Sequence, residues 1–337
     1  MKINLAHSIC MKFNLGYLKR VSKINDGFSG NCYKFITDKS KYFIKVYPKN
    51  KLETVISTAK AELFFKKGDI PILVRINNME EGDHLVMGDK IFIVFPYVVI
   101  QKIKKWQKEL YYEMGDFLGK MHRYSIKTSD KNNLETFKFG KTASLSLGSM
   151  HLLLDKLHNK RIINKYDRLA ISNMVVKIGY LRNILLEEFN LDNVALIHGD
   201  FHPGNLCIKD GKIKMIYDFD HHCHRSIYYE LAKVIINTCF SGSFYNKNFI
   251  RTEYFLRGYQ RHVTLKPDIL KTATKICHFE IFNSFLVEMK LVKRSTNKLL
   301  KVIIEKEKRT LDYFVNPNNL NDFTERICNF LNKRINV

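Results

Sequence analysis

The sequence contains no apolar run that approaches the ~20 residues needed for a membrane-spanning helix. Its most hydrophobic stretches, such as residues 91–100 and 231–236, are short. Near the N-terminus, Asn4, His7 and Ser8 interrupt what would have to be the apolar core of a secretory signal. We therefore expect no transmembrane span and a cytoplasmic chain that begins at this N-terminus.

Cysteines are few and form no recognisable pattern. The seven cysteines are an odd number, are widely spaced and include no Cys-x-x-Cys pair. This spacing indicates neither a disulfide framework nor a zinc knuckle. We expect small apolar side chains that stay reduced inside the cell.

Acidic residues are few relative to basic ones, with 33 Asp plus Glu against 56 Lys plus Arg and a formal net charge of +23. Clustered basic residues would favour a nucleic acid or another polyanion, because binding releases counterions. The charge is spread over the whole chain, however, which is typical of a broad compositional bias. Composition thus argues against a dedicated nucleic-acid function, and it defines no oligomeric state.

The hydrophobic pattern changes at Pro96. Before it, residues 16–96 are predicted to form a small β-rich unit with one helix. Two β-prone runs at residues 32–37 and 42–47, joined by the turn formers of residues 38–40, predict a hairpin.

One helix and a second hairpin follow in the same part of the chain. Residues 52–67 carry apolar side chains at helical spacing and stop at Gly68, a common C-terminal signal. Residues 73–76 and 84–96 predict the second pair of strands.

Beyond Pro96 the pattern is helical, beginning with a helix predicted at residues 104–124. Residues 125–149 are rich in Ser, Thr, Lys and Asn without clear periodicity, and they predict an irregular connection. Further helices are predicted at residues 152–157, 166–190, 228–239, 249–259, 269–292 and 297–314. The fold class is therefore α+β, with an N-terminal lobe of residues 1–97 and a helical C-terminal lobe of residues 98–337.

The strongest functional signal is IHGDFHPGN at residues 197–205, followed after a short β-prone hairpin by MIYDFD at residues 215–220. Phosphoryl transfer from ATP needs a carboxylate to orient the attacking hydroxyl and oxygen ligands to hold Mg²⁺ on the phosphates. Asp200 and Asn205 stand five residues apart, the interval between base and metal ligand in the protein-kinase catalytic loop. Asp218 has the place of the second metal ligand.

These residues resemble the signature of the aminoglycoside phosphotransferase and choline kinase family, written His-Gly-Asp-x-His-x-x-Asn with a later Asp-Phe/Trp-Asp/Glu element. Every fixed position matches. The resemblance, which runs over about residues 23–233, implies a protein-kinase-like two-lobed fold with Asp200 as catalytic base and Mg²⁺ on Asn205 and Asp218. Residues expected to orient the loop or the acceptor are His198, His202 and Asp220.

Two other interpretations of the motif are weaker. Gly, Asp, Asn and Pro are the usual turn formers, but a plain turn explains neither the second acidic element nor the hairpin between the two motifs. A catalytically silent kinase fold, acting as a nucleotide-binding or interaction protein with a basic surface, is the alternative function. The presence of Asp200, Asn205 and Asp218 counts against it.

Residues 24–33, which read INDGFSGNCY, precede the first hairpin. Their glycines allow the backbone to bend closely over phosphates and offer N–H groups to them, although a Gly-x-x-Gly turn alone is common in hairpins. The predicted nucleotide-binding residues of this loop are Gly27, Ser29, Gly30 and Asn31.

Lys45 is a single cation in the apolar run of residues 42–46. A buried ammonium needs an anion, and the phosphates of ATP together with a helix carboxylate would supply it. Glu62 is the predicted partner and Glu53 the alternative, because the helix register is not fixed by the sequence. A solvent-facing Lys45 on an edge strand is the other possibility.

Several segments have supporting or neutral roles. Phe95 and Tyr97 lie in the predicted hinge of residues 95–98, where backbone groups would pair with the adenine edge and Phe95 would face the base. A strand that only connects the two lobes is equally compatible with this segment. Residues 114–122 and 229–232 resemble helices of the family and are mainly packing signals. The run HHCH at residues 221–224 is not expected to gather a metal, because neighbouring side chains do not easily converge on one ion. The basic residues 290–309 suit a solvated helix face.

The acceptor is predicted from charge. Residues 239–337 contain 18 Lys plus Arg against 9 Asp plus Glu, and a polycationic aminoglycoside would need the opposite balance. We expect an ATP- and Mg²⁺-dependent kinase that phosphorylates a hydroxyl of a small molecule. An amino alcohol, an amino acid, a sugar derivative or an antibiotic with few positive charges would fit.

Overall fold

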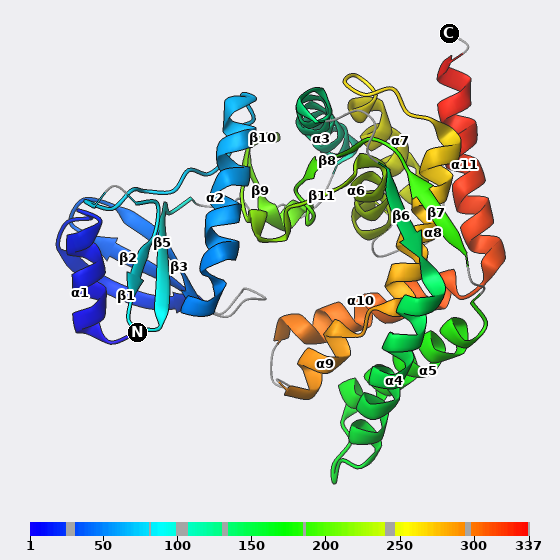
Figure 1. Cartoon of the computed structure of the whole chain (residues 1–337), viewed down its shortest axis with the longest axis horizontal. Coiled ribbons are helices and arrows are strands. Elements are labelled where there is room, and N and C mark those ends of the chain that lie inside the picture. The colour runs from blue at the N-terminus through cyan, green and yellow to red at the C-terminus, as the bar shows by residue number, and fades with distance from the viewer. Residues whose placement is uncertain are drawn as a thin grey trace. The chain divides into compact units, whose positions relative to one another are not determined.

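In the computed structural model, the chain forms two compact units (Figure 1). The first contains Met1–Lys105 and His198–His222, and the second contains Trp106–Ile197 and Cys223–Val337. The sequence placed residues 198–222 with the C-terminal lobe, whereas their contacts group them with the N-terminal residues. The described residues are 1–24, 31–80, 82–98, 107–129, 134–184, 187–239, 247–293 and 298–335.

A five-stranded antiparallel sheet is the centre of the first unit. Its strands are β1 (Leu18–Ile24), β2 (Cys32–Thr37), β3 (Lys41–Pro48), β4 (Leu85–Met87) and β5 (Lys90–Pro96), in the order β1-β2-β3-β5-β4. The predicted first hairpin is confirmed, because β2 and β3 pair across the turn of residues 38–40 with Cys32 opposite Lys45.

The second predicted hairpin is wrong in one of its strands. β4 and β5 pair with each other across Gly88, so both lie inside the single run predicted at residues 84–96. Gly88 has a φ of 61°, a left-handed conformation that glycine adopts readily in tight turns. Residues 73–76 are not a strand, although the N–H of Ile76 donates to the carbonyl of Val94 (2.8 Å).

One helix covers each face of this sheet. α1 (Ile3–Lys12), which the sequence analysis did not predict, packs its buried side chains on one face. α2 (Leu52–Lys67) has the predicted bounds and ends at Gly68, and its Val55 packs on the other face. Side chains alternate along a strand, so Lys45 of β3 points to the α2 side.

Residues 198–222 add a short hairpin to the first unit. Its elements are the 3₁₀ turn η2 (Pro203–Asn205), the strands β9 (Leu206–Lys209) and β10 (Lys212–Ile216), and the 3₁₀ turn η3 (Phe219–His221). The hairpin predicted between the two motifs is confirmed. Ile216 forms a parallel bridge with Ile72, and the buried Phe219 lies 5.5 Å from the ring of Phe65 on α2.

Over its described residues, the second unit is mainly helical and contains two small sheets, each a single pair of strands. Its helices are α3 (Lys108–Thr128), α4 (Phe139–His158), α5 (Lys165–Arg182), α6 (Ile227–Val234), α7 (Lys247–Tyr259), α8 (Pro267–Asn283), α9 (Leu286–Lys293), α10 (Lys298–Phe314) and α11 (Pro317–Ile335), with a π-helical turn at Ile235–Cys239. Its strands are β6 (Glu135–Lys138) paired with β7 (Glu188–Leu191), and β8 (Val194–Ile197) paired with β11 (Cys223–Ser226).

Several predicted elements of this unit need correction. The irregular connection at residues 125–149 is wrong, because α3 runs to Thr128 and α4 begins at Phe139. The polar side chains of α4 belong to its exposed face, while a stripe of apolar residues is buried. The helix predicted at residues 166–190 ends at Arg182 and is followed by β7, and the one predicted at 269–292 is interrupted between α8 and α9. α11 was not predicted.

α3 and α7 approach each other closely at glycines. A Cβ on Gly115 would lie 1.9 Å from the carbonyl oxygen of Phe255, and one on Gly258 would lie 2.1 Å from that of Tyr112. Small residues are therefore required at this crossing. None of the helices in the described residues is long and apolar enough to cross a bilayer.

Candidate active site

The His-Gly-Asp part of the motif follows β8 and turns sharply. His198 is fully buried, and its Nδ1 accepts the backbone N–H of Asp200 (3.2 Å), so its proton lies on Nε2, which donates to the carbonyl of Tyr217 (3.1 Å). Gly199 has a φ of 79°, and a Cβ there would lie 1.9 Å from the carbonyl oxygen of His221. The shape of the loop therefore depends on both residues.

The rest of the loop places two side chains against the Asp200 carboxylate. His202 Nε2 lies 3.3 Å from Asp200 Oδ2, while its Nδ1 accepts the N–H of Gly204 (2.9 Å). Asn205 Nδ2 donates to the Asp200 carbonyl (2.9 Å) and to its Oδ2 (3.3 Å). The five-residue interval in the sequence thus corresponds to direct contact. The Asp200 side chain is 38% exposed, so it is accessible to a substrate.

Asp218 follows β10 with a left-handed backbone, at φ 68° and ψ 59°. This conformation is unfavourable for residues other than glycine, and Asp and Asn tolerate it best. Such strain often marks a functional position. Next to it, the N–H of Tyr217 donates to the carbonyl of Asn205 (3.1 Å), which ties the loop to the end of the strand.

The donor atoms of Asn205 and Asp218 fit a divalent metal ion of the Mg²⁺ type. The amide nitrogen of Asn205 is engaged by Asp200, so its amide oxygen is the atom that remains for a cation. The Asp218 side chain is 38% exposed. Mg²⁺ is usually held by one or two carboxylates, other oxygen ligands and the phosphates of the substrate.

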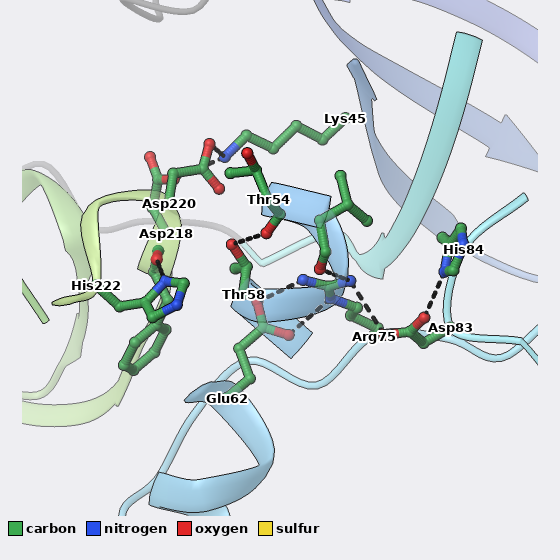
Figure 2. A network of polar contacts seen from close by, with 12 residues as sticks. Lys45, Thr54, Thr58, Glu62, Arg75, Asp83, His84, Asp218, Asp220 and His222 are labelled. Carbon is green, nitrogen blue, oxygen red and sulfur yellow. Dashed lines mark hydrogen bonds and ion pairs between the residues drawn. The ribbon is translucent and has the colours of Figure 1, made fainter. Parts of the chain in front are cut away.

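Lys45 lies in a network of anionic partners, as Figure 2 shows. Its Nζ is 2.7 Å from Asp218 Oδ1 and 2.7 Å from Asp220 Oδ2, and the Tyr47 hydroxyl donates to Asp220 (2.8 Å). Burial alone would lower the pKa of Lys45, but the neighbouring carboxylates and Tyr47 raise it above its ordinary value. For the Tyr47 hydroxyl, burial acts in the opposite direction and raises its pKa. Burial would raise the pKa of Asp220, yet Lys45 holds it below its ordinary value.

The predicted pair of Lys45 with Glu62 is not formed, and this expectation is corrected. Arg75 holds Glu62 instead, with Nε 2.7 Å from Oε2 and Nη2 3.4 Å from Oε1, and it also contacts Asp83 (3.1 Å) (Figure 2). Burial raises the pKa of Glu62 to about 7 despite the attraction of Arg75. Glu53, the alternative partner, has an exposed side chain.

The predicted phosphate loop is described in part. Gly27, Ser29 and Gly30 lie outside the described residues. Asn31 immediately precedes β2, and its carbonyl accepts the N–H of Val46 (3.0 Å).

The predicted hinge residues are largely engaged within the first unit. Phe95 is buried in the core beneath α2 and lies 6.3 Å from the ring of Phe43. The N–H of Tyr97 donates to the carbonyl of Lys41 (3.0 Å), and the Lys34 ammonium lies 4.1 Å from the Tyr97 ring. A role of Phe95 and Tyr97 toward adenine stays a prediction.

Of the three histidines after Asp220, His222 is held by hydrogen bonds within the first unit. His222 Nδ1 lies 2.7 Å from the carbonyl oxygen of Phe219, and its Nε2 lies 2.8 Å from Ser57 Oγ on α2. His221 and His224 are exposed. Among the described residues, no three His, Cys, Asp or Glu side chains form a group able to hold a metal ion.

The sequence analysis missed Tyr47, which contacts Asp220 in the site, and Arg75, which lies outside the site as the partner of Glu62. Arg75 is a lone cation in an apolar run, the same signal that identified Lys45. Tyr47 is two residues after Lys45, so the alternation of a strand places both side chains on one face. The two family-like segments of residues 114–122 and 229–232 contact each other. His122 of α3 contacts Glu230 of α6 (2.9 Å), and it also contacts the Tyr259 hydroxyl (2.7 Å).

The solved structures similar to this chain include kinases and phosphotransferases of small molecules. Amicoumacin kinase hAmiN, in complex with AMP-PNP, Ca²⁺ and Ami, is 14% identical with a TM-score of 0.61, over 91% of this chain and 92% of that one. Spectinomycin phosphotransferase APH(9)-Ia, in complex with ADP and spectinomycin, is 15% identical with a TM-score of 0.62, over 97% and 99%. The gentamicin complex of APH(2″)-IIa is 13% identical with a TM-score of 0.53, over 91% and 96%.

At these identities the likeness establishes the fold, which is that of the protein-kinase-like phosphotransferases. A family model described as the phosphotransferase enzyme family matches residues 20–262. The chain belongs to this family, which confirms the resemblance seen in the motifs. No protein of curated function matches the sequence at a significant level.

Proposed function

We propose that the protein transfers the γ-phosphate of ATP to a hydroxyl group of a small molecule, with Mg²⁺ as cofactor. The observation that carries the proposal is the contact of Lys45 with Asp218, two residues 173 positions apart in the chain. A buried ammonium beside a carboxylate of a metal-binding loop is the arrangement that a nucleotide triphosphate and its cation require. We propose a cytoplasmic location, where ATP is supplied.

Asp200 is proposed to orient the acceptor hydroxyl and to accept its proton. His202 and Asn205 both approach its Oδ2 atom, which fixes the plane of the carboxylate. A carboxylate held in this way contributes by positioning, and such a group typically accounts for ~10²–10⁴-fold in rate.

Asn205 and Asp218 are proposed to hold Mg²⁺ through an amide oxygen and a carboxylate. Bound Mg²⁺ supplies neutralisation of the charge on the phosphates. Lys45 adds a second positive charge on the same side of the nucleotide, because it already lies beside Asp218.

The acceptor is proposed to carry few positive charges. Six of the nine acidic residues between positions 239 and 337 form ion pairs with Lys or Arg, which leaves little negative charge for a polycation. These six are Glu280, Glu288, Glu305, Glu307, Asp312 and Asp322. An amino alcohol, an amino acid, a sugar derivative or an antibiotic with few ammonium groups fits this balance.

The test is ADP production by the purified full chain with ATP, Mg²⁺ and a panel of alcohols, amino alcohols, amino acids, sugars and antibiotics. Asp200→Ala is expected to lower turnover by ~10²–10⁴-fold while the dissociation constant for Mg·AMP-PNP changes little. The matched control is Asp210→Asn, an exposed residue on the β9–β10 turn. Full activity of Asp200→Ala would refute its role, and nucleotide binding without turnover on any acceptor would favour the silent alternative.

A further inference from the structure

Among the described residues of the first unit, Lys45 and Arg75 are both buried cations, and their hydrogen-bond partners differ. Arg75 binds both oxygens of Glu62 and donates to the carbonyl of Val55 (3.3 Å) and to Asp83 (3.1 Å). Glu62 and Arg75 are both buried, at 8% exposure each. The helix carboxylate that kinases use for their strand lysine is therefore committed to another residue.

Lys45 instead has its carboxylates on the segment after β10. Asp220 is the more enclosed of the two, with a side chain 22% exposed against 38% for Asp218. Its two oxygens are each 2.8 Å from the Tyr47 hydroxyl, and one of them is 2.7 Å from Lys45 Nζ. The neighbouring Phe219 is buried against α2, so the backbone that carries Asp220 is anchored.

Tyr47 completes a closed triangle with Asp220 and Lys45. Its ring centroid is 5.3 Å from the Lys45 ammonium, a distance at which an aromatic face attracts a cation. Because Tyr47 and Lys45 leave the same face of β3, the strand itself sets their separation. The ammonium is thus held from two sides, by an anion and by a ring.

From this geometry we propose that Asp220 and Tyr47 are the positioning residues for Lys45, in the place of a helix carboxylate. Asp218 also contacts Lys45 (2.7 Å), but it is the more exposed of the two carboxylates and is the one assigned to the cation. The Glu62–Arg75 pair is a structural clamp that joins α2 to the segment carrying Arg75 and Asp83. The inference deepens the proposed function and rests on Lys45 meeting the nucleotide phosphates.

The test compares Tyr47→Phe, Asp220→Asn, Glu62→Gln and Arg75→Lys in the full chain. The readouts are the dissociation constant for Mg·AMP-PNP, kcat and KM for ATP, and Tm. Tyr47→Phe, which removes the hydroxyl, is expected to raise the dissociation constant for Mg·AMP-PNP about tenfold. Asp220→Asn is expected to raise it on the order of tenfold to a hundredfold, and KM for ATP should rise in parallel. Tyr47→Phe should leave Tm nearly unchanged.

Arg75→Lys is the matched control, because lysine cannot reproduce the bidentate contact with Glu62. It is expected to lower Tm while the dissociation constant for Mg·AMP-PNP stays within about twofold. A larger loss of affinity in Glu62→Gln than in Tyr47→Phe would overturn the inference. So would tighter binding in Asp220→Asn, because Asp220 would then compete with the nucleotide for Lys45.

Failure of the two proposals is distinguishable. A wild-type chain that binds Mg·AMP-PNP but consumes no ATP refutes the proposed function, while the order of affinities among the variants still decides the positioning of Lys45. A wild-type chain that binds no nucleotide overturns both.

Discussion

A buried ion triad in the second unit makes stability depend on pH. Lys177 of α5 lies 2.6 Å from Glu288 of α9 and 2.7 Å from Glu307 of α10. The side chains of Lys177 and Glu288 are fully buried, and that of Glu307 is 15% exposed. One ammonium therefore meets two carboxylates where water is largely excluded. Burial and the charge of Glu288 raise the pKa of Glu307 to about 7, against the pull of Lys177.

The direction of this pH dependence follows from how many protons the folded and unfolded states bind. The unfolded chain releases the Glu307 proton near its ordinary pKa of 4.5, whereas the folded chain holds it up to about 7. Between these values the unfolded state binds fewer protons, so the free energy of unfolding falls as pH rises, and the loss is complete above about pH 7. The difference between these two pKa values of Glu307 corresponds to a change in the free energy of unfolding on the order of 3 kcal/mol, which is an upper value for this one group.

Glu307→Gln tests this directly, because the amide is neutral at every pH and its oxygen still accepts from Lys177. The variant is expected to be more stable than the wild type at pH 8, by up to ~3 kcal/mol, and nearly equal to it at pH 5. Urea unfolding followed by far-UV circular dichroism at both pH values measures the difference.

The control is Glu305→Gln on the same helix, whose side chain is 40% exposed and pairs with Lys165 at the surface. It should change stability by less than ~1 kcal/mol at either pH. If Glu307→Gln is instead destabilised at pH 8, Lys177 needs both carboxylates ionised and the direction of the pKa shift is wrong.

Three further outcomes are expected. Asn205→Ala and Asp218→Ala should raise the Mg²⁺ concentration needed for half-maximal ATP consumption, Asp218→Ala more strongly because it removes a full charge; unchanged Mg²⁺ dependence in both contradicts the metal site. Expression of the chain should give bacteria little resistance to kanamycin-like polycations, and a strong rise in the inhibitory concentration that is lost with Asp200→Ala would reveal an acidic acceptor pocket. Gly258→Ala should lower stability by ~1–3 kcal/mol through overpacking against α3, measured as Tm, whereas Gly179→Ala, whose Cβ meets nothing within 4 Å, should be neutral or stabilising.

Local signals were sufficient for part of the fold. The β2–β3 hairpin was predicted because its turn formers lie directly between two β-prone runs. α2 was predicted because its apolar period ends directly at Gly68. The first part of α4 was missed because its polar, exposed face dominates the composition of residues 125–149, while its buried residues are few and widely spaced. The last part of α4 corresponds to the helix predicted at residues 152–157. α1 was missed for a similar reason, since only Ala6, Ile9 and Cys10 are buried in it.

The candidate site was predictable to the extent that its residues share a motif. Asp200 and Asn205 are close in the chain, so their contact follows from the loop alone. The partner of Lys45 was not predictable, because it depends on which of several carboxylates reaches β3 after the chain folds. Glu62 binds Arg75, whose position in an apolar run indicates burial but does not identify its partner. Asp220 lies 175 residues from Lys45 in the chain.

The grouping of residues 198–222 with the N-terminal part of the chain has a consequence for the order of events during synthesis. β3, β5 and α2 emerge from the ribosome well before the segment that supplies Asp218, Asp220 and Phe219. At ~5–20 residues per second, the interval between residues 98 and 222 lasts roughly 6–25 s. During this time Lys45 has neither aspartate, and the surface of α2 that receives Phe219 stays uncovered. The first unit thus completes its contacts only after residues 106–197 of the second unit have been made, so a truncation before residue 222 removes part of both.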